Sequence, residues 1–322
     1  MKLYKSIFQE SWEITRRHPL LWFFGICVFF WGGKGIELEQ FFTNADLLRS
    51  DLSPLRPTFW SGRQWMVIVD LFNGDQVWIA GFAVIVALFL LIAFVLIMSA
   101  HIGLIDAYGQ FDANTHGRYK THHALTAIKQ HFWGVASVQL VTKAVSYGLL
   151  ALAALPLFFD QLGQWQIVYS FLLFFIVTPV AVYLSTVAKF AMNDVVINKT
   201  PWVAALTRGR VLVRAQFGVI LEFLVFVYIV YVIATALAVV LTQLVSLPIL
   251  FAAAGDSVMI WGMNGYVFYS TFYHSVGALI LMIVVALFSS WHMGSWTLFY
   301  RELLAGRKSS VTKQFWNRAP KQ

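Results

Sequence analysis

The chain has 322 residues, of which 59% are hydrophobic and only 12% are charged. A soluble domain has about 45–50% apolar and about 25% charged residues, so this composition excludes an ordinary soluble protein and indicates an integral membrane protein. The net charge of +8 borders apolar segments and forms no separate basic domain, which predicts anionic membrane lipids as partners and no nucleic acid.

Residues 1–18 predict an amphipathic helix at the membrane surface. One side of this helix carries mostly apolar side chains, namely Leu3, Tyr4, Ile7, Ser11 and Ile14. The other side is polar and carries Lys5, Gln9, Glu13 and Arg16.

Six apolar segments predict an all-α polytopic membrane protein with six transmembrane helices. They lie at about residues 20–33, 78–105, 132–159, 166–189, 217–247 and 274–300. The apolar part of the first, Leu20–Trp31, is shorter than the roughly 20 residues that a crossing needs, so a re-entrant segment is the alternative. We expect the whole chain to form a single membrane domain.

The distribution of basic residues favours six crossings. With six, 18 Lys and Arg residues lie on the side of the termini and 4 on the other; without the first crossing the numbers are 14 and 8. The positive-inside rule then predicts a plasma (inner) membrane protein with both termini in the cytoplasm. Residues 32–77 become an extracytoplasmic cap, and residues 301–322 a basic cytoplasmic tail.

Similar boundary motifs suggest three repeats of a surface helix followed by a helical hairpin. Each of three basic motifs precedes an outward span: Arg16-Arg17-His18-Pro19, Lys129-Gln130-His131-Phe132 and Arg214-Ala215-Gln216-Phe217. Because membrane boundaries resemble one another without common descent, chance similarity is an equal alternative.

The stretch Pro201–Glu222 predicts a basic surface helix that leads into a span. Thr200 suits its cap and Pro201 its first position. Its apolar face is predicted to hold Trp202, Leu206, Val213 and Phe217. Long arginine stems can lie on lipid while their guanidinium groups reach phosphates. We therefore predict lipid-headgroup binding by the basic residues of three surface helices: Arg208, Arg210, Arg214, Arg16, Arg17 and Lys129.

Two stretches resemble a known group of proteins. Ala205–Gly218, ALTRGRVLVRAQFG, and Leu298–Leu303, LFYREL, are similar to the signature of uncharacterised bacterial six-span proteins related to the glycerophosphoryl diester phosphodiesterase membrane domain. The resemblance implies a six-span layout. It does not imply a hydrolase, because a soluble phosphodiesterase domain is only sometimes attached in that group and this chain ends soon after its sixth span.

Motifs of metalloproteases, serine hydrolases and nucleotide-binding loops are absent, so we predict no enzyme and no cofactor. The one cysteine, Cys27, lies in an apolar run and is predicted to pack there. Several histidines and aspartates cluster between the second and third spans, namely His116, His122, His123, His131, Asp106 and Asp112. Their spacing matches no known metal site, so no metal is predicted.

Charged residues inside a membrane are costly and are by default hypotheses of function. Lys143 and Glu222 lie inside spans, and together with His101 and His292 they predict an intramembrane polar cluster toward the cytoplasmic leaflet. At 1.5 Å per residue, Lys143 and Glu222 have similar depths of about 9 and about 8 Å, so we predict that they pair. The alternative is ordinary hydrogen bonding between helices together with snorkelling of the charged side chains to the interface.

The preferred function is therefore a non-enzymatic membrane protein that binds anionic lipid headgroups at the cytoplasmic leaflet and organises or senses that leaflet. The alternative is a transporter or permease component with a cytoplasm-facing polar cavity around the polar cluster. A lipid-modifying enzyme with a scattered site is a third class. The sequence does not identify a protein partner.

Overall fold

The computed structural model describes residues 2–30, 76–110, 121–154, 165–254, 259–260 and 263–306. Within these ranges the chain forms eight α-helices and one pair of two-residue strands, so the predicted all-α class is confirmed. Most of the predicted cap and the tail beyond residue 306 lie outside the described residues.

The chain divides into two compact units. Unit 1 comprises Met1–Phe30, Gly103–Thr126 and Arg214–Gln322, and unit 2 comprises Trp31–Ile102 and Ala127–Val213. Each unit is described by itself.

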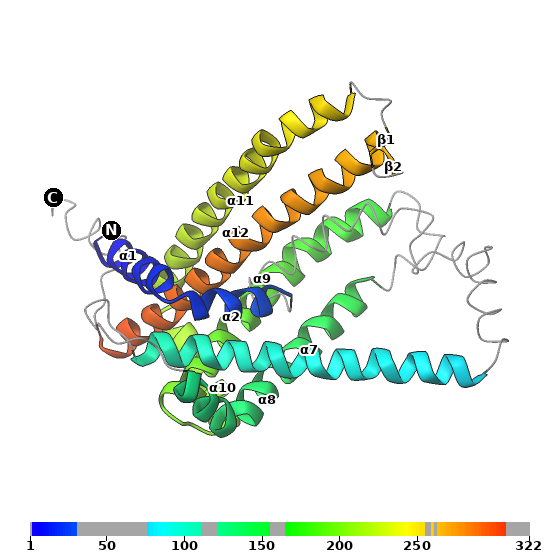
Figure 1. Cartoon of the computed structure of the whole chain (residues 1–322). Coiled ribbons are helices and arrows are strands. Elements are labelled where there is room, and N and C mark those ends of the chain that lie inside the picture. The colour runs from blue at the N-terminus through cyan, green and yellow to red at the C-terminus, as the bar shows by residue number, and fades with distance from the viewer. Residues whose placement is uncertain are drawn as a thin grey trace. The chain divides into compact units, whose positions relative to one another are not determined.

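The described residues of unit 1 contain four complete helices and the strand pair. They are α1 (Lys2–Arg17), α2 (Pro19–Phe30), α11 (Phe217–Ala254), β1 (Met259–Ile260), β2 (Met263–Asn264) and α12 (Gly265–Leu304). Helices α11 and α12 run side by side and are joined through the antiparallel strands (Figure 1). A proline restricts the residue before it to extended backbone, so His18 separates α1 from α2 and Pro19 begins α2.

The core of unit 1 is aromatic. Phe223 of α11 is fully buried and stacks on Phe299 of α12, with ring centroids 3.9 Å apart. Trp296 meets Phe223 edge-on at 5.0 Å, and Tyr4 lies 6.1 Å from it. This cluster joins α1, α11 and α12.

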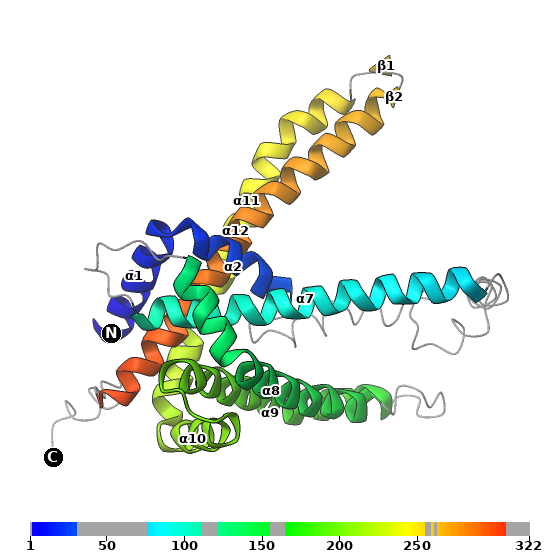
Figure 2. The same cartoon turned by 60° about the horizontal axis from the view of Figure 1, so that its bottom comes forward.

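In its described residues, unit 2 contains all or part of four helices. They are α7 (Gln76–Gln110) as far as Ile102, α8 (Thr121–Ala154) from Ala127, α9 (Trp165–Ile197) and α10 (Trp202–Ala215) as far as Val213. Helices α8 and α9 run side by side (Figure 2), and Gln139 of α8 donates a hydrogen bond to the sulfur of Met192 of α9 at 3.1 Å. A Cβ added at Gly134 would lie 2.8 Å from Val195 of α9, so this glycine permits close packing.

Four described segments are long and apolar enough to cross a membrane: Ala80–Gln110, Phe175–Ile197, Phe217–Ala234 and Met282–Leu304. They coincide with four predicted spans. The apolar part of α2 is shorter, and α8 is not among the four. On α7 the apolar window is only 11% buried, and large side chains such as Phe82 and Phe89 are exposed. Lipid contact accounts for such a surface, which a soluble monomer rarely has.

Several helix boundaries differ from the prediction. Helix α7 continues to Gln110, α9 to Ile197 and α12 to Leu304, so polar residues at the expected membrane edge do not end these helices. Hydropathy marks where a helix leaves lipid, whereas the backbone stays helical until a breaking residue intervenes. Helix α8 also runs unbroken through His131, where the predicted repeat required a surface helix to end.

Candidate functional site

The connection between α9 and α10 sets the position of α10. Lys199 adopts a left-handed backbone with φ of 54°, a conformation that often follows the end of a helix. Pro201 then precedes α10, and its carbonyl accepts the first hydrogen bond, from the amide of Ala205 at 2.9 Å. Two helices are thereby joined by a tight turn of the chain.

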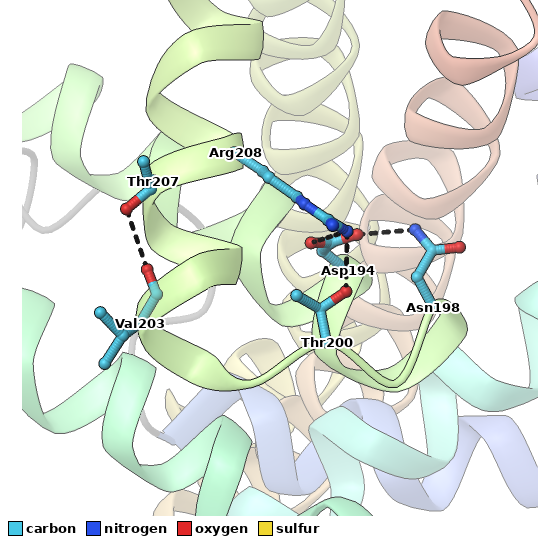
Figure 3. Close-up of polar contacts among 6 residues, drawn as sticks. All are labelled: Asp194, Asn198, Thr200, Val203, Thr207 and Arg208. Carbon is cyan, nitrogen blue, oxygen red and sulfur yellow. Dashed lines mark hydrogen bonds and ion pairs between the residues drawn. The ribbon is translucent and has the colours of Figure 1, made fainter.

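Arg208 ties α10 back to this connection (Figure 3). Its guanidinium donates a hydrogen bond to the hydroxyl of Thr200 at 3.1 Å and lies 3.7 Å from the buried carboxylate of Asp194. The second oxygen of Asp194 accepts a hydrogen bond from Asn198 at 2.6 Å. Arg208 therefore has a structural contact, although its side chain remains 65% exposed and can still meet a second anion.

The buried face of α10 differs from the predicted one. Ala205, Gly209 and Val213 are buried, four residues apart, and a Cβ added at Gly209 would lie 3.0 Å from the carbonyl oxygen of Val187 on α9. Small residues allow the two backbones to approach closely. Of the predicted apolar face only Val213 is fully buried, while Trp202 and Phe217 are exposed.

The exposed face of α10 mixes arginine with apolar side chains. Arg210 and Arg214 are exposed and lie about one helical turn apart. Seen down the helix axis, Val203 lies between these two arginines, so all three are on the same face. Val203 and Val211 are 56% and 61% exposed. Helix α10 contains no acidic residue of its own.

The amphipathic pattern of α1 is confirmed, but protein covers its apolar face. Tyr4, Ile7, Ser11 and Ile14 are buried, and the Ser11 hydroxyl donates a hydrogen bond to the backbone carbonyl of Trp291 on α12 at 2.8 Å. The amphipathic pattern is satisfied by protein packing in place of lipid.

The other basic residues predicted to bind headgroups are exposed. Arg16 and Arg17 lie on the polar face of α1, where Arg17 pairs with Glu13, and Lys129 lies on α8. The six predicted residues fall three in each unit, so a shared binding surface for all six stays a prediction.

The predicted polar cluster is likewise divided between the units. In unit 1, Glu222 accepts a hydrogen bond from the Tyr4 hydroxyl at 3.0 Å, and His292 accepts one from the indole of Trp296 at 3.0 Å. Burial, and after it the bond to Glu222, raises the pKa of Tyr4, so its hydroxyl stays protonated and donates. Sequence reasoning did not assign a partner on α1 to Glu222.

In unit 2, His101 is fully buried; its Nδ1 lies 2.9 Å from the carbonyl oxygen of Ile97, while its Nε2 has no hydrogen-bond partner. Lys143 is half-buried with its ammonium 5.7 Å from the centre of the Tyr147 ring. Because Lys143 and Glu222 belong to different units, their pairing stays a prediction.

Lys189 is a further buried basic residue, with 6% of its surface exposed. The sequence reading ended a span at Lys189 and assigned it to the cytoplasmic edge. The apolar residues Phe190, Ala191 and Met192 continue directly after Lys189 and could have indicated its burial. All three are themselves buried.

Among the described residues no group of three His, Cys, Asp or Glu side chains could hold a metal ion. His122 and His123 are exposed, with ring centroids 6.2 Å apart, whereas His116 and Asp112 lie outside the described residues.

These features define an all-helical membrane protein with four described helices able to cross a bilayer. Comparison of the chain with known protein families, curated proteins and solved structures finds no match. The resemblance to the phosphodiesterase-related membrane proteins therefore stays a prediction.

Proposed function

We propose that this chain is a non-enzymatic, six-span plasma-membrane protein that binds anionic lipid headgroups at its cytoplasmic face and thereby organises or senses that leaflet. The observation that carries the proposal is the exposed face of α10. That face presents arginines beside exposed valines, while the opposite face is packed on protein.

Lipid is the environment that suits both kinds of side chain. Exposed valines are favoured in the acyl region and guanidinium groups at the phosphates, so a helix lying along the interface satisfies both. The start of α11, which follows α10 in the chain, supports a position of α10 at the membrane interface. Phe217 and Leu221 there are exposed apolar residues, as expected where a helix enters the acyl region.

The lipid preference is testable with the purified protein in detergent. Phosphatidylglycerol should raise the melting temperature more than phosphatidylcholine does, because ligands that bind the folded state stabilise it. A basic residue near an anionic surface contributes about 1 kcal/mol, so Arg210→Gln with Arg214→Gln should weaken phosphatidylglycerol binding about 30-fold. Raising the salt from about 50 mM to about 500 mM should remove much of the preference.

The matched control is Arg49→Gln with Arg56→Gln, which makes the same charge change at positions predicted to lie on the other side of the membrane. The control should keep the wild-type preference. Equal stabilisation of the wild type by both lipids, or the same loss in the control, would contradict headgroup binding by α10.

The six-span arrangement has a separate test. In a Cys27→Ser background, a cysteine at Ser50 should react with an impermeant thiol reagent in intact cells, because this position is predicted to be extracytoplasmic. A cysteine at Ser309 should react only after lysis. The reverse pattern, or reaction at both positions in intact cells, rules out this topology.

The alternative of a transporter or permease component has one observation in its favour. His101 and Lys189 are buried basic side chains within unit 2, and intramembrane ionisable groups often mark solute pathways. An anionic metabolite that raised the melting temperature of the wild type, but not of His101→Phe, would favour this alternative.

A further inference from the structure

A cleft with a mixed polar and apolar lining lies in unit 2 beside the start of α10. Its volume is about 560 Å³, within the range of small-molecule sites. It is lined by three elements: α8 contributes Gln130, His131 and Gly134, α9 contributes Val195, and the connection to α10 contributes Lys199, Thr200, Pro201 and Trp202. We call it the α8–α10 cleft.

The lining suits an anion. Lys199 brings a positive charge, and the side chains of Gln130, His131 and Thr200 can donate hydrogen bonds. No carboxylate is among the lining residues. Asp194, which precedes Val195, is held by Asn198 and Arg208, so its charge is directed to those partners.

The cleft coincides with the change from polar to apolar surface along α8. Before it the helix exposes mostly polar residues such as Lys129, and beside it, between the lining residues His131 and Gly134, Trp133 is 77% exposed. Exposed Leu140 and Val141 follow. Tryptophan prefers the boundary between headgroups and acyl chains. In the proposed topology, this transition lies at the cytoplasmic interface, at the level of lipid phosphates.

The backbone conformation of Lys199 favours a residue other than lysine. Its left-handed backbone is the conformation that glycine adopts without cost after a helix, and a lysine there is strained. The side chain of Lys199 is exposed at the cleft, whereas Arg208 makes the described polar contacts that tie α10 back to Thr200 and to Asp194 of α9.

We propose that the α8–α10 cleft binds the phosphate group of an anionic glycerolipid, with Lys199 as the main charged contact and Trp202 beside the glycerol. This inference rests on the proposed function and narrows it to one site. A soluble phosphate compound offers the same chemistry, and the experiment below separates the two sources.

The test is the variant Lys199→Gly, studied as the full-length protein in detergent. Because glycine fits the left-handed backbone, the lipid-free variant should melt at the wild-type temperature or above it. Its affinity for phosphatidylglycerol should nevertheless fall about fivefold, the effect of one basic residue near an anionic headgroup. Lys199→Arg should keep most of the affinity. Lys5→Gln makes the same charge change on α1, outside the cleft, and should have little effect.

The outcomes distinguish the site from the general function. If Arg210→Gln with Arg214→Gln weakens lipid binding and Lys199→Gly does not, the cleft proposal is wrong while headgroup binding by α10 stands. If the wild type does not distinguish phosphatidylglycerol from phosphatidylcholine, the proposed function fails first. Stabilisation by inorganic phosphate or glycerol 3-phosphate that depends on Lys199, without a response to phosphatidylglycerol, overturns the lipid assignment.

Discussion

Replacing Phe223 with alanine should reduce the free energy of unfolding by about 3 kcal/mol, the lower end of the range for buried phenylalanine. Phe223 is fully buried and lies among the rings of Phe299, Trp296 and Tyr4. Detergent solvates apolar side chains in the unfolded protein, so the loss comes mainly from the packing of these rings and the cavity left behind. Denaturation in dodecyl sulfate, followed by tryptophan fluorescence, measures the change.

Phe217→Ala provides the matched control because it makes the same substitution at the start of the same helix. Phe217 is 58% exposed and its ring faces the surroundings of the protein, so the variant should lose less than about 1 kcal/mol. Equal losses at the two positions would mean that α1, α11 and α12 do not share an aromatic core.

Hydropathy was sufficient to predict the helices that cross the membrane most clearly. The predicted spans at 78–105, 166–189, 217–247 and 274–300 each contain or overlap a described segment able to span a bilayer. The same signal could not define helix length, because the α9 backbone remains helical through Lys189 to Ile197. Nor could it show that α8 continues unbroken through His131, which is followed by Phe132 and not by a proline such as the one that follows α1.

The sequence predicted the basic character of α10 but not its orientation. Periodicity was judged from large apolar residues, which pointed to Trp202 and Phe217, whereas the buried face is formed by Ala205 and Gly209. A close approach of two backbones requires small side chains, and these carry little weight in a hydrophobic pattern. The contact of Arg208 with Asp194 was also unpredictable, because it depends on the turn between α9 and α10.

The pattern of α1 was read correctly but its partner was not. An amphipathic helix has the same periodicity whether its apolar face meets lipid or protein. Ser11 and Thr15 are the distinguishing residues, because both are fully buried on that face and both hydroxyls are hydrogen-bonded. Hydroxyl groups at buried positions of an apolar stripe indicate contact with another helix, since acyl chains offer no hydrogen-bond partner.

The packing of α2 on α12 depends on Gly25. A Cβ added at this position would overlap the backbone carbonyl oxygen of Ala286 and the hydroxyl of Ser290. The hydroxyl of Ser290 also donates a hydrogen bond to the carbonyl of Leu21, so neither obstacle can move freely. Gly25→Ala should therefore reduce stability by about 1–3 kcal/mol through overpacking, even though alanine favours helix formation by about 1 kcal/mol.

Gly218→Ala makes the same change on α11, where an added Cβ meets nothing within 4 Å. Here only the helix preference acts, so this variant should be as stable as the wild type or more stable, by up to about 1 kcal/mol. In the same dodecyl sulfate titration, Gly25→Ala should thus lower the unfolding free energy, and Gly218→Ala should leave it unchanged or raise it. If Gly25→Ala were as stable as Gly218→Ala, α2 would have to lie far enough from α12 to leave room for the added Cβ, and the close packing of these helices would be wrong.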